Sequence, residues 1–306
     1  MGKKKSGPLF LDTSIQIARV VHGPKTKERI RNRIAQHDQT STGLVSRQEF
    51  KRRLLKEAEY LLRILNKYNS FDEVNQHVIR LWGQWPGRVR KRNICLQTLA
   101  QVHGGDDKER TERLSLYLRS LLVAGLKRFD QQVDSVRQDA NCACARADVV
   151  EKVPLRKYNF GPDRCSDTRP GQCGVVAFLQ TRTDACKMIL EKIRSLKPAE
   201  KTNDLTQAEE FLQEILFHPE KAVSYNPCLS TGDLLIALES LGIESFYTLN
   251  SAESQHLCRA LKQTLIVRPI DPLKEDVVCP QQEKKWPDFG QQEKSSAKDA
   301  SPKIDN

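Results

Sequence analysis

In the first third of the chain, short apolar runs typical of strands alternate with segments whose apolar residues recur at helical spacing. Residues 9–11 predict a strand, and residues 43–45 predict a second one. Basic helical segments lie between them, from about Ile15 and over 25–36. Ser46 opens an amphipathic helix whose apolar positions recur at helical spacing, namely Phe50, Leu54, Ala58, Leu61 and Leu65.

The same alternation returns near the other end. Residues 232–241 predict a helix that Ser230 caps and Gly242 ends. Three further elements follow, a strand, a helix and a strand at 245–248, 252–263 and 265–267. Helices that alternate with short strands predict an α/β fold with a central parallel sheet covered on both faces.

The stretch between these two parts has a different pattern. Helical spacing extends over 109–138, 183–196 and 206–217. Residues 140–174 are rich in Cys, Asp, Arg, Pro and Gly and predict a loop-rich module, and 175–179 predicts a strand. We therefore expect a first core part, an inserted helical and cysteine-containing module, a second core part and a disordered tail, at 1–68, 69–221, 222–271 and 272–306.

Charge is distributed unevenly along the 306 residues, which carry a formal net charge of +11. The first hundred residues hold 21 Lys and Arg against 8 Asp and Glu, whereas the remainder holds 29 against 31. Such asymmetry indicates a surface that faces a polyanion, and we expect that partner to be nucleic acid. The alternative is a solvated basic face without a ligand.

Several function classes lack support in the sequence. No run approaches the 18 apolar residues of a membrane span, and the N-terminal region has no apolar segment typical of a secretory signal. We therefore expect a cytoplasmic protein without a membrane span. The sequence contains no phosphate-binding glycine loop, so nucleotide-driven chemistry has no support. It also contains no nucleophile elbow, so acyl-transfer chemistry has no support.

Three carboxylates lie where strands and helices meet. Asp12 ends the first predicted strand, Glu49 lies in the first turn of the long helix, and Asp233 opens the helix before another strand. Ligands collect at the carboxyl ends of parallel strands, and carboxylates that converge there repel one another unless a cation lies between them. Oxygen ligands of this kind suit Mg²⁺ or Mn²⁺.

Each carboxylate also has a purely structural explanation. Asp12 can cap the helix that follows it, and Glu49 can complete a capping box with Ser46. Asp233 can do the same with Ser230. Acidic residues are in any case favoured in the first turn of a helix.

Taken together, three segments resemble the signature blocks of PIN-domain nucleases. The segments are LFLDTS at 9–14, LVSRQEF at 44–50 and GDLLIALESLGIESFYTLN at 232–250. The resemblance covers residues 8–66 and 225–270. Glu49 and Asp233 are 184 residues apart, far more than compact members of the family need, so the intervening module is an insertion.

The resemblance implies a three-layer α/β/α fold and metal-dependent cleavage of RNA, and many members of the family are toxins of toxin–antitoxin pairs. The family's metal-binding acids match Asp12, Glu49 and Asp233, with Ser14 beside the metal site. A fourth acid often follows the strand that ends in Thr, but this chain has Asn250 there. That departure puts a second tightly bound metal in doubt, and Glu253 is a substitute one turn further on.

Four cysteines in the turn-rich segment form a second candidate metal site. Cys142, Cys144, Cys165 and Cys173 have the spacing C-x-C-x20-C-x7-C. Four thiolates can hold a structural Zn²⁺ and order a region that lacks an apolar core. The alternative is a set of scattered reduced cysteines, and the six histidines show no ligand spacing and are interpreted as structural.

Basic residues on both sides of the predicted acidic site are candidates for RNA binding. The two groups are Arg29, Arg31 and Arg33, and Arg47, Lys51, Arg52 and Arg53. A basic run at 88–92 follows Trp82 and Trp85 and can hold phosphates, or simply form a solvated edge.

We therefore expect a Mg²⁺- or Mn²⁺-dependent endoribonuclease with Asp12, Glu49, Asp233 and Asn250 in its active site. One alternative is a non-catalytic PIN-like scaffold that binds RNA or protein. Another is a structure-specific DNA nuclease. RNA is the expected partner, with a protein inhibitor or antitoxin as a second one, and the sequence does not indicate an oligomeric state.

Overall fold

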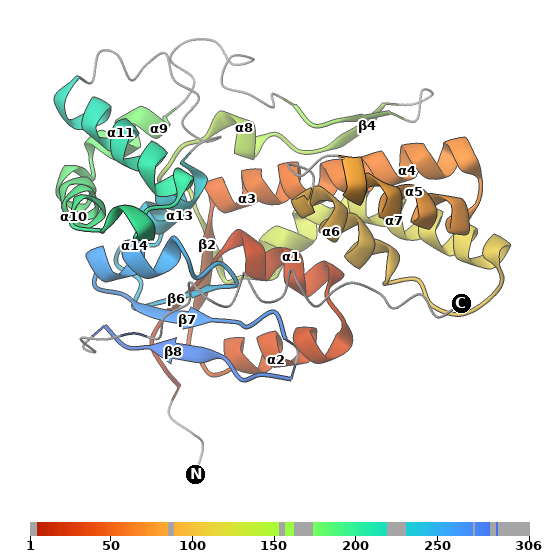
Figure 1. Ribbon diagram of the computed structural model, residues 1–306, viewed down its shortest axis with the longest axis horizontal. Helices are drawn as coiled ribbons and strands as arrows, with labels where there is room; N and C mark the ends of the chain where they lie inside the picture. Colours follow the sequence, from red (N-terminus) through yellow and green to blue (C-terminus); the bar gives the residue numbers. More distant parts are fainter. Residues whose placement is uncertain are drawn as a thin grey trace.

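The computed structural model describes residues 5–84, 89–152, 157–161, 174–218, 231–271, 273–281 and 286. It is an α/β structure around a mostly parallel sheet of six strands in the order β3-β2-β1-β6-β7-β8 (Figure 1). Among the described strands of this sheet, β8 alone pairs antiparallel, with β7. The strands are β1 (Leu9–Leu11), β2 (Thr40–Gly43), β3 (Ser135–Arg137), β6 (Ser245–Thr248), β7 (Thr264–Val267) and β8 (Val277–Cys279).

The two central strands come from opposite ends of the sequence. Leu9 of β1 pairs with Ser245 of β6, and Leu11 pairs with Tyr247. The three side chains of β1 are fully buried, as continuous apolar runs are in parallel sheets that are covered on both faces. This pairing brings the carboxyl ends of β1 and β6 to one edge of the sheet.

Helices cover both faces of the sheet. On one face, Leu11 and Ile266 share a core with Ile15 and Ile30 from α1 (Thr13–Val21) and α2 (Pro24–Ile34). On the other face, the Phe10 and Phe246 rings stack 5.6 Å apart. The helices that pack there are α9 (Val175–Gln180), α10 (Thr183–Arg194), α11 (Asn203–Phe217), α13 (Gly232–Glu239) and α14 (Ser254–Ala260).

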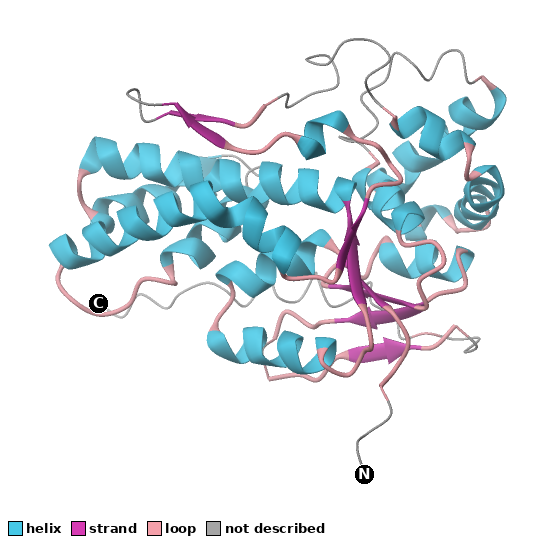
Figure 2. Cartoon of the chain, turned by 180° about the vertical axis from the view of Figure 1, so that it is seen from behind, coloured by secondary structure: helices cyan, strands magenta, loops and turns pink. Residues whose placement is uncertain are grey.

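A second body of helices lies beside the sheet and has its own apolar core (Figures 1 and 2). Phe50 and Phe129 contact each other there, with ring centroids 5.0 Å apart. Helix α3 leads into this body through one π-helical turn. The elements are α3 (Leu44–Phe50), η1 (Lys51–Leu55), α4 (Lys56–Tyr68), α5 (Phe71–Gln84), α6 (Val89–Leu99) and α7 (Asp107–Gln131).

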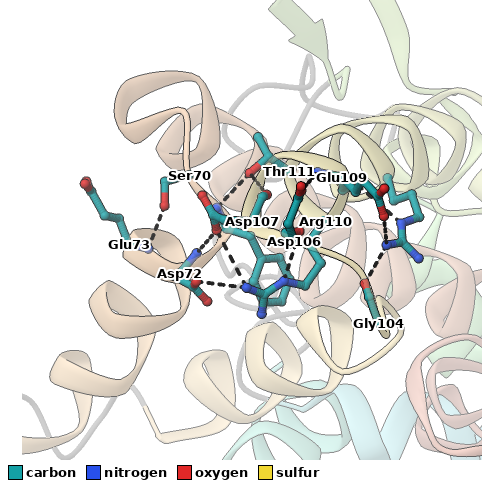
Figure 3. Close-up of polar contacts among 11 residues, drawn as sticks. Ser70, Asp72, Glu73, Gly104, Asp106, Asp107, Glu109, Arg110 and Thr111 are labelled. Carbon is teal, nitrogen blue, oxygen red and sulfur yellow. Dashed lines mark hydrogen bonds and ion pairs between the residues drawn. The ribbon is translucent and has the colours of Figure 1, made fainter.

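Polar contacts join the N-terminal ends of α5 and α7 (Figure 3). Asp106 caps α7 by accepting a hydrogen bond from the backbone of Glu109 at 2.8 Å. Asp107 accepts from the backbone of Asp72 at 2.9 Å, and Arg110 pairs with the Asp72 carboxylate at 2.8 Å. These contacts fix α5 against α7 at the end of the helical body remote from the sheet.

Smaller elements cross the junction between the sheet and the helical body. Lys51 of the π-helical turn donates hydrogen bonds to the backbone carbonyls of Cys144, Ala147 and Phe160. The segment that contains these carbonyls forms α8 (Ala143–Arg146), β4 (Val150–Lys152) and β5 (Lys157–Asn159). A separate short turn, η4 (Pro198–Glu200), precedes α11.

Most predicted elements are confirmed, with boundaries displaced by a few residues. The strands at 9–11, 245–248 and 265–267 are present, as are helices at 183–196 and 206–217. The predicted α/β class with a mostly parallel sheet is also confirmed. No helix among the described residues has the length and apolar character required to cross a membrane.

The predicted strand at 43–45 is wrong. Strand β2 ends at Gly43, and Leu44 already begins α3, with Gly43 as its N-cap. The capping box of Ser46 and Glu49 is therefore absent, because both residues lie inside the helix. The short apolar pair at 44–45 fits a buried helix as well as a strand, and spacing alone does not separate the two.

Three further predictions are corrected. The strand at 175–179 is helix α9, again a short apolar run of ambiguous type. The helix predicted over 109–138 ends at Gln131, and residues 135–137 form β3, so the middle of the chain adds a strand to the sheet. The tail predicted as disordered contains β8, in which Cys279 is fully buried against β7.

Candidate functional site

Asp12 lies at the carboxyl end of β1 and is the N-cap of α1. Its carboxylate accepts hydrogen bonds from the backbone of Thr13 at 2.6 Å and from the hydroxyl of Thr248 at 2.7 Å. The Ser14 hydroxyl also donates to it and accepts a bond from the backbone of Leu249. The capping explanation for Asp12 is thus confirmed, and Asp12 additionally joins the ends of β1 and β6.

Glu49 lies on α3 and faces the same edge of the sheet. Its side chain is 7% exposed, and Arg53 donates to Oε1 at 2.9 Å. The other oxygen, Oε2, is buried and has no hydrogen-bond partner among the described residues. A buried carboxylate oxygen without a donor is costly, so this atom is available to a ligand that supplies positive charge.

A second buried carboxylate fixes the helix that carries Glu49. Glu239 of α13 accepts a hydrogen bond from the backbone of Val45 at 3.0 Å, in the first turn of α3. Gly43 makes room for it, because a Cβ there would lie 2.0 Å from Glu239 Oε2. Glu239 therefore joins α3 to α13, the helix on which Asp233 lies.

Asp233 lies in the first turn of α13 and approaches Glu49 from the opposite side. The helix begins at Gly232, where a Cβ would lie 2.3 Å from Glu49 Oε1. The side-chain amide of Asn250 donates to Asp233 Oδ2 at 3.1 Å. Glycine at this position therefore permits the close approach of the two acidic helices.

The carboxylates affect one another's protonation. Burial raises the pKa of Asp233 well above its usual value, and the charges of Glu49, Asp12 and Glu253 raise it further. Burial also raises the pKa of Glu49, against the opposing charge of Arg53. Because the charges of Asp12, Glu49 and Glu253 all act on Asp233, we call these four acids the acidic unit.

Arg53 is the counter-ion inside this unit. Burial lowers the pKa of its guanidinium, but the charges of Glu49, Asp233 and Asp12 raise it, and the net shift is upward. The π-helical turn at 51–55 places Arg53 beside the site, and π-helical turns are frequent at functional sites. Arg53 thus stabilises an acidic cluster that burial alone would force to take up protons.

Two adjoining cavities open beside the acidic unit. The first, of about 130 Å³, is lined by Glu49, Asp233 and Glu253 among others. The second, of about 240 Å³, is lined by Asp12, Asp233 and Asn250 among others. Arg53, Arg90 and Asp233 line both cavities. The structure therefore brings all four predicted active-site residues to one region.

The donor set of the acidic unit suits a hard divalent cation. Carboxylate and amide oxygens are the ligands that Mg²⁺ and Mn²⁺ prefer. Across the parts of the chain that the structure describes, no three His, Cys, Asp or Glu side chains are arranged to hold a metal. Each of these groups already has a partner in the protein, since Arg53 donates to Glu49, Asn250 donates to Asp233, and Thr13 and Thr248 donate to Asp12.

Several of the predicted RNA-binding residues have internal partners instead. Arg47 pairs with Asp130 at 2.9 Å, and Lys51 binds backbone carbonyls. On α2, Arg29 pairs with Glu275 and Arg33 with Asp276, each at 3.0 Å. Of the remaining three, Arg53 pairs with Glu49, Arg31 is exposed and Arg52 is half-buried.

The predicted cysteine site lies partly outside the described residues, because Cys165 and Cys173 belong to a part that the structure does not describe. Cys142 and Cys144 are buried thiols at α8. The zinc prediction therefore stays a prediction.

Sequence reasoning missed Glu239 and the acceptor role of Asp12 toward Thr248. Glu239 follows a run of five apolar residues in α13, and that conflict with the pattern was the available signal. Thr248 ends a predicted strand and gave no separate signal.

No protein-family model, curated protein or solved structure matches this chain.

Proposed function

We propose that this protein is a Mg²⁺- or Mn²⁺-dependent endoribonuclease. The observation that carries the proposal is the convergence of Asp12, Glu49 and Asp233, with Arg53 as their counter-ion, at the carboxyl end of a parallel sheet. Ligand sites in open α/β sheets lie at this edge. Burial and the neighbouring acids raise the pKa of Asp233, and strongly shifted pKa values of this kind cluster at functional sites.

The ligands for the ion would be the carboxylates of Asp12, Glu49 and Asp233, with the Asn250 amide at the periphery. The chemistry that such an ion supplies is activation of a water and stabilisation of the leaving oxygen of a phosphodiester. Arg53 and Arg90 line both cavities and offset the repulsion between the acidic unit and a phosphate. Ser14 and Thr248 hold the Asp12 carboxylate in place through their hydroxyl groups.

Cleavage of a labelled RNA tests the proposal directly. Wild-type protein should cut single-stranded RNA with Mn²⁺ or Mg²⁺ and should lose this activity in EDTA. Asp233→Asn should be inactive, while Glu210→Gln, an acidic residue of α11 that lines neither cavity, should cut normally. Activity that survives both EDTA and Asp233→Asn would contradict the proposal.

A second function is supported by one specific observation. Asn250 already donates to Asp233, and Arg53 already neutralises Glu49, so the acids are paired without a metal. This arrangement also suits a non-catalytic scaffold with a PIN-like fold that binds RNA. RNA binding without turnover in any divalent metal would favour the scaffold over the nuclease.

A further inference from the structure

The second cavity beside the acidic unit has a mixed chemical character. Its walls come from α1, from α6 and from the segment after β6. The acidic unit forms one side through Asp12 and Asp233, and Arg53 and Arg90 lie where the two cavities meet. We call this cavity the α1–α6 groove, and its lining residues are Asp12, Ser14, Ile17, His22, Arg53, Arg90, Ile94, Gln97, Asp233, Leu249 and Asn250.

Apolar side chains also line the groove. Ile17 of α1, Ile94 of α6 and Leu249 line it together. Three apolar groups from three separate elements provide flat contact area for a planar ring, and an aliphatic wall beside a charged site is typical of a ligand cavity. The lining of the groove therefore combines carboxylate groups with apolar side chains.

Two further polar side chains line the same groove. The Gln97 amide and the His22 imidazole have no side-chain hydrogen bond to any described residue, yet both line the groove. Burial lowers the pKa of His22, and Lys27 and Arg268 lower it further, so the imidazole stays neutral. A neutral imidazole and a primary amide each offer one donor group and one acceptor group.

We propose that the α1–α6 groove binds one nucleobase, that of the nucleotide next to the phosphodiester that is cut, and we call this base-binding site the seat. This inference rests on the proposed function and extends it to the choice of substrate. The ring lies against Ile17, Ile94 and Leu249, and Gln97 and His22 form hydrogen bonds to the edge of the base. Arg53 and Arg90 contact the adjoining phosphate.

The groups that line the groove support a nucleotide as the occupant. A nucleotide combines a planar ring with hydrogen-bonding edges and a phosphate, and the lining of the groove includes three apolar side chains, an amide, an imidazole and two guanidinium groups. Amide side chains are common readers of base edges, and arginine is the usual partner of phosphate. An apolar ligand would leave Gln97 and His22 without partners, which is unfavourable.

The seat also gives a role to the middle of the chain. Ile94, Gln97 and Arg90 all belong to α6, within the predicted insertion at 69–221. Base preference at the cut is therefore set by this segment, whereas the carboxylates come from elements next to the sheet. The two contributions can be changed separately by substitution.

Base preference is measured with RNA substrates that differ only in the base on either side of one cleavable bond. Wild type, Gln97→Ala and Gln97→Glu are compared in Mn²⁺ by the ratio of kcat/KM among the four bases. Gln97→Glu keeps the size of the side chain and replaces its donor by an acceptor. The matched control is Asn93→Ala, an exposed residue of the same helix that lines neither cavity.

We expect wild type to prefer one base at one position by about tenfold, in keeping with the strength of a well-placed amide–base pair. Gln97→Ala should remove that preference, Gln97→Glu should move it to another base, and Asn93→Ala should retain it. Cleavage with the same preference in all four proteins would overturn the seat while the nuclease function stands.

Failure of the proposed function leads to a separate measurement. If wild type does not cut RNA, a fluorescein-labelled hexaribonucleotide is titrated with each protein in Ca²⁺, and the same oligonucleotide with one abasic position is compared. The seat requires that one abasic position lowers affinity for wild type and Asn93→Ala, and that it lowers affinity by a smaller factor for Gln97→Ala, which has lost one contact with the base. Equal affinities across these pairs would overturn the seat.

Discussion

Arg53 donates a hydrogen bond from Nη2 to Oε1 of Glu49, 2.9 Å away and one helical turn earlier in the chain. The pair lies where a π-helical turn joins α3 to α4, and the guanidinium also faces the charges of Asp233 and Asp12. Arg53 thus supplies positive charge at the place where a divalent cation would otherwise supply it. Metal binding and this ion pair compete for the same carboxylate.

Replacement of Arg53 should therefore strengthen metal binding. In Arg53→Gln the carboxylates lose their internal counter-ion, and their repulsion makes a cation more favourable. We expect the Kd for Mn²⁺ at pH 8 to fall by about tenfold or more, the effect of one nearby charge at an intermediate dielectric. Isothermal titration calorimetry measures this value.

The control for that experiment is Arg52→Gln, on the same turn, which lies outside both cavities. Its Kd for Mn²⁺ should stay close to that of wild type. A Kd for Arg53→Gln that is unchanged or higher would show that the guanidinium does not compete with the ion.

Asp233→Asn should stabilise the protein in the absence of metal. Burial and the neighbouring acids raise the pKa of Asp233 in the folded state, so its charged form is disfavoured there relative to the unfolded chain. Stability is then complete below the unfolded pKa and falls as pH rises toward the folded value. The neutral amide avoids this loss, and at pH 7 we expect a gain of about 1 kcal/mol in the free energy of unfolding.

Urea denaturation in EDTA measures the effect of Asp233→Asn. The gain should disappear near pH 4, where wild-type Asp233 is protonated as well. A loss of stability at pH 7 would mean that the hydrogen bond from Asn250 outweighs the repulsion among the acids.

Glu239 gives a separate dependence on pH. Burial raises the pKa of Glu239 to about 8, and the backbone donors of Val45 and Leu44 only partly offset this. Because the folded pKa lies above the unfolded one, its contribution to stability is lost as pH rises from about 4.5 toward 8. Glu239→Gln should therefore be more stable relative to wild type at pH 8 than at pH 5.

The matched variant Glu239→Ala separates charge from hydrogen bonding. It removes the acceptor for the Val45 backbone and should cost about 1–3 kcal/mol at pH 5. Chemical denaturation at the two pH values measures both variants. If the free energies of unfolding of wild type and Glu239→Gln differed by the same amount at both pH values, that result would contradict titration of Glu239.

Lys51 should act on stability and not on RNA affinity. Its ammonium donates to the carbonyls of Cys144, Ala147 and Phe160, so Lys51→Met leaves buried acceptors unpaired. We expect a loss of about 3 kcal/mol in the free energy of unfolding. Fluorescence anisotropy with labelled RNA, on the fraction that stays folded, should give a wild-type Kd. A weaker Kd in the folded protein would restore Lys51 as an RNA-binding residue.

The division between local and tertiary information is visible in particular residues. Spacing identified the strand at 9–11 and the strand at 245–248, because apolar runs bounded by polar residues determine local structure. The segment at 43–45 was misassigned, because two buried apolar residues fit a strand and a helix equally. The Gly43 N-cap and its contact with Glu239, 196 residues later, determine that a helix begins at Leu44.

The sequence by itself determined the alternation of helices and strands and the acidic residues at their ends. Local chemistry suffices for this, since Asp12 follows an apolar run and Asp233 opens a helix. The tertiary structure alone decided which basic residues are internal. Lys51 and Arg47 are indistinguishable from Arg53 in a list of charges, yet only Arg53 faces the acids, because rotation around one helix and the packing of distant segments determine each side chain's partner.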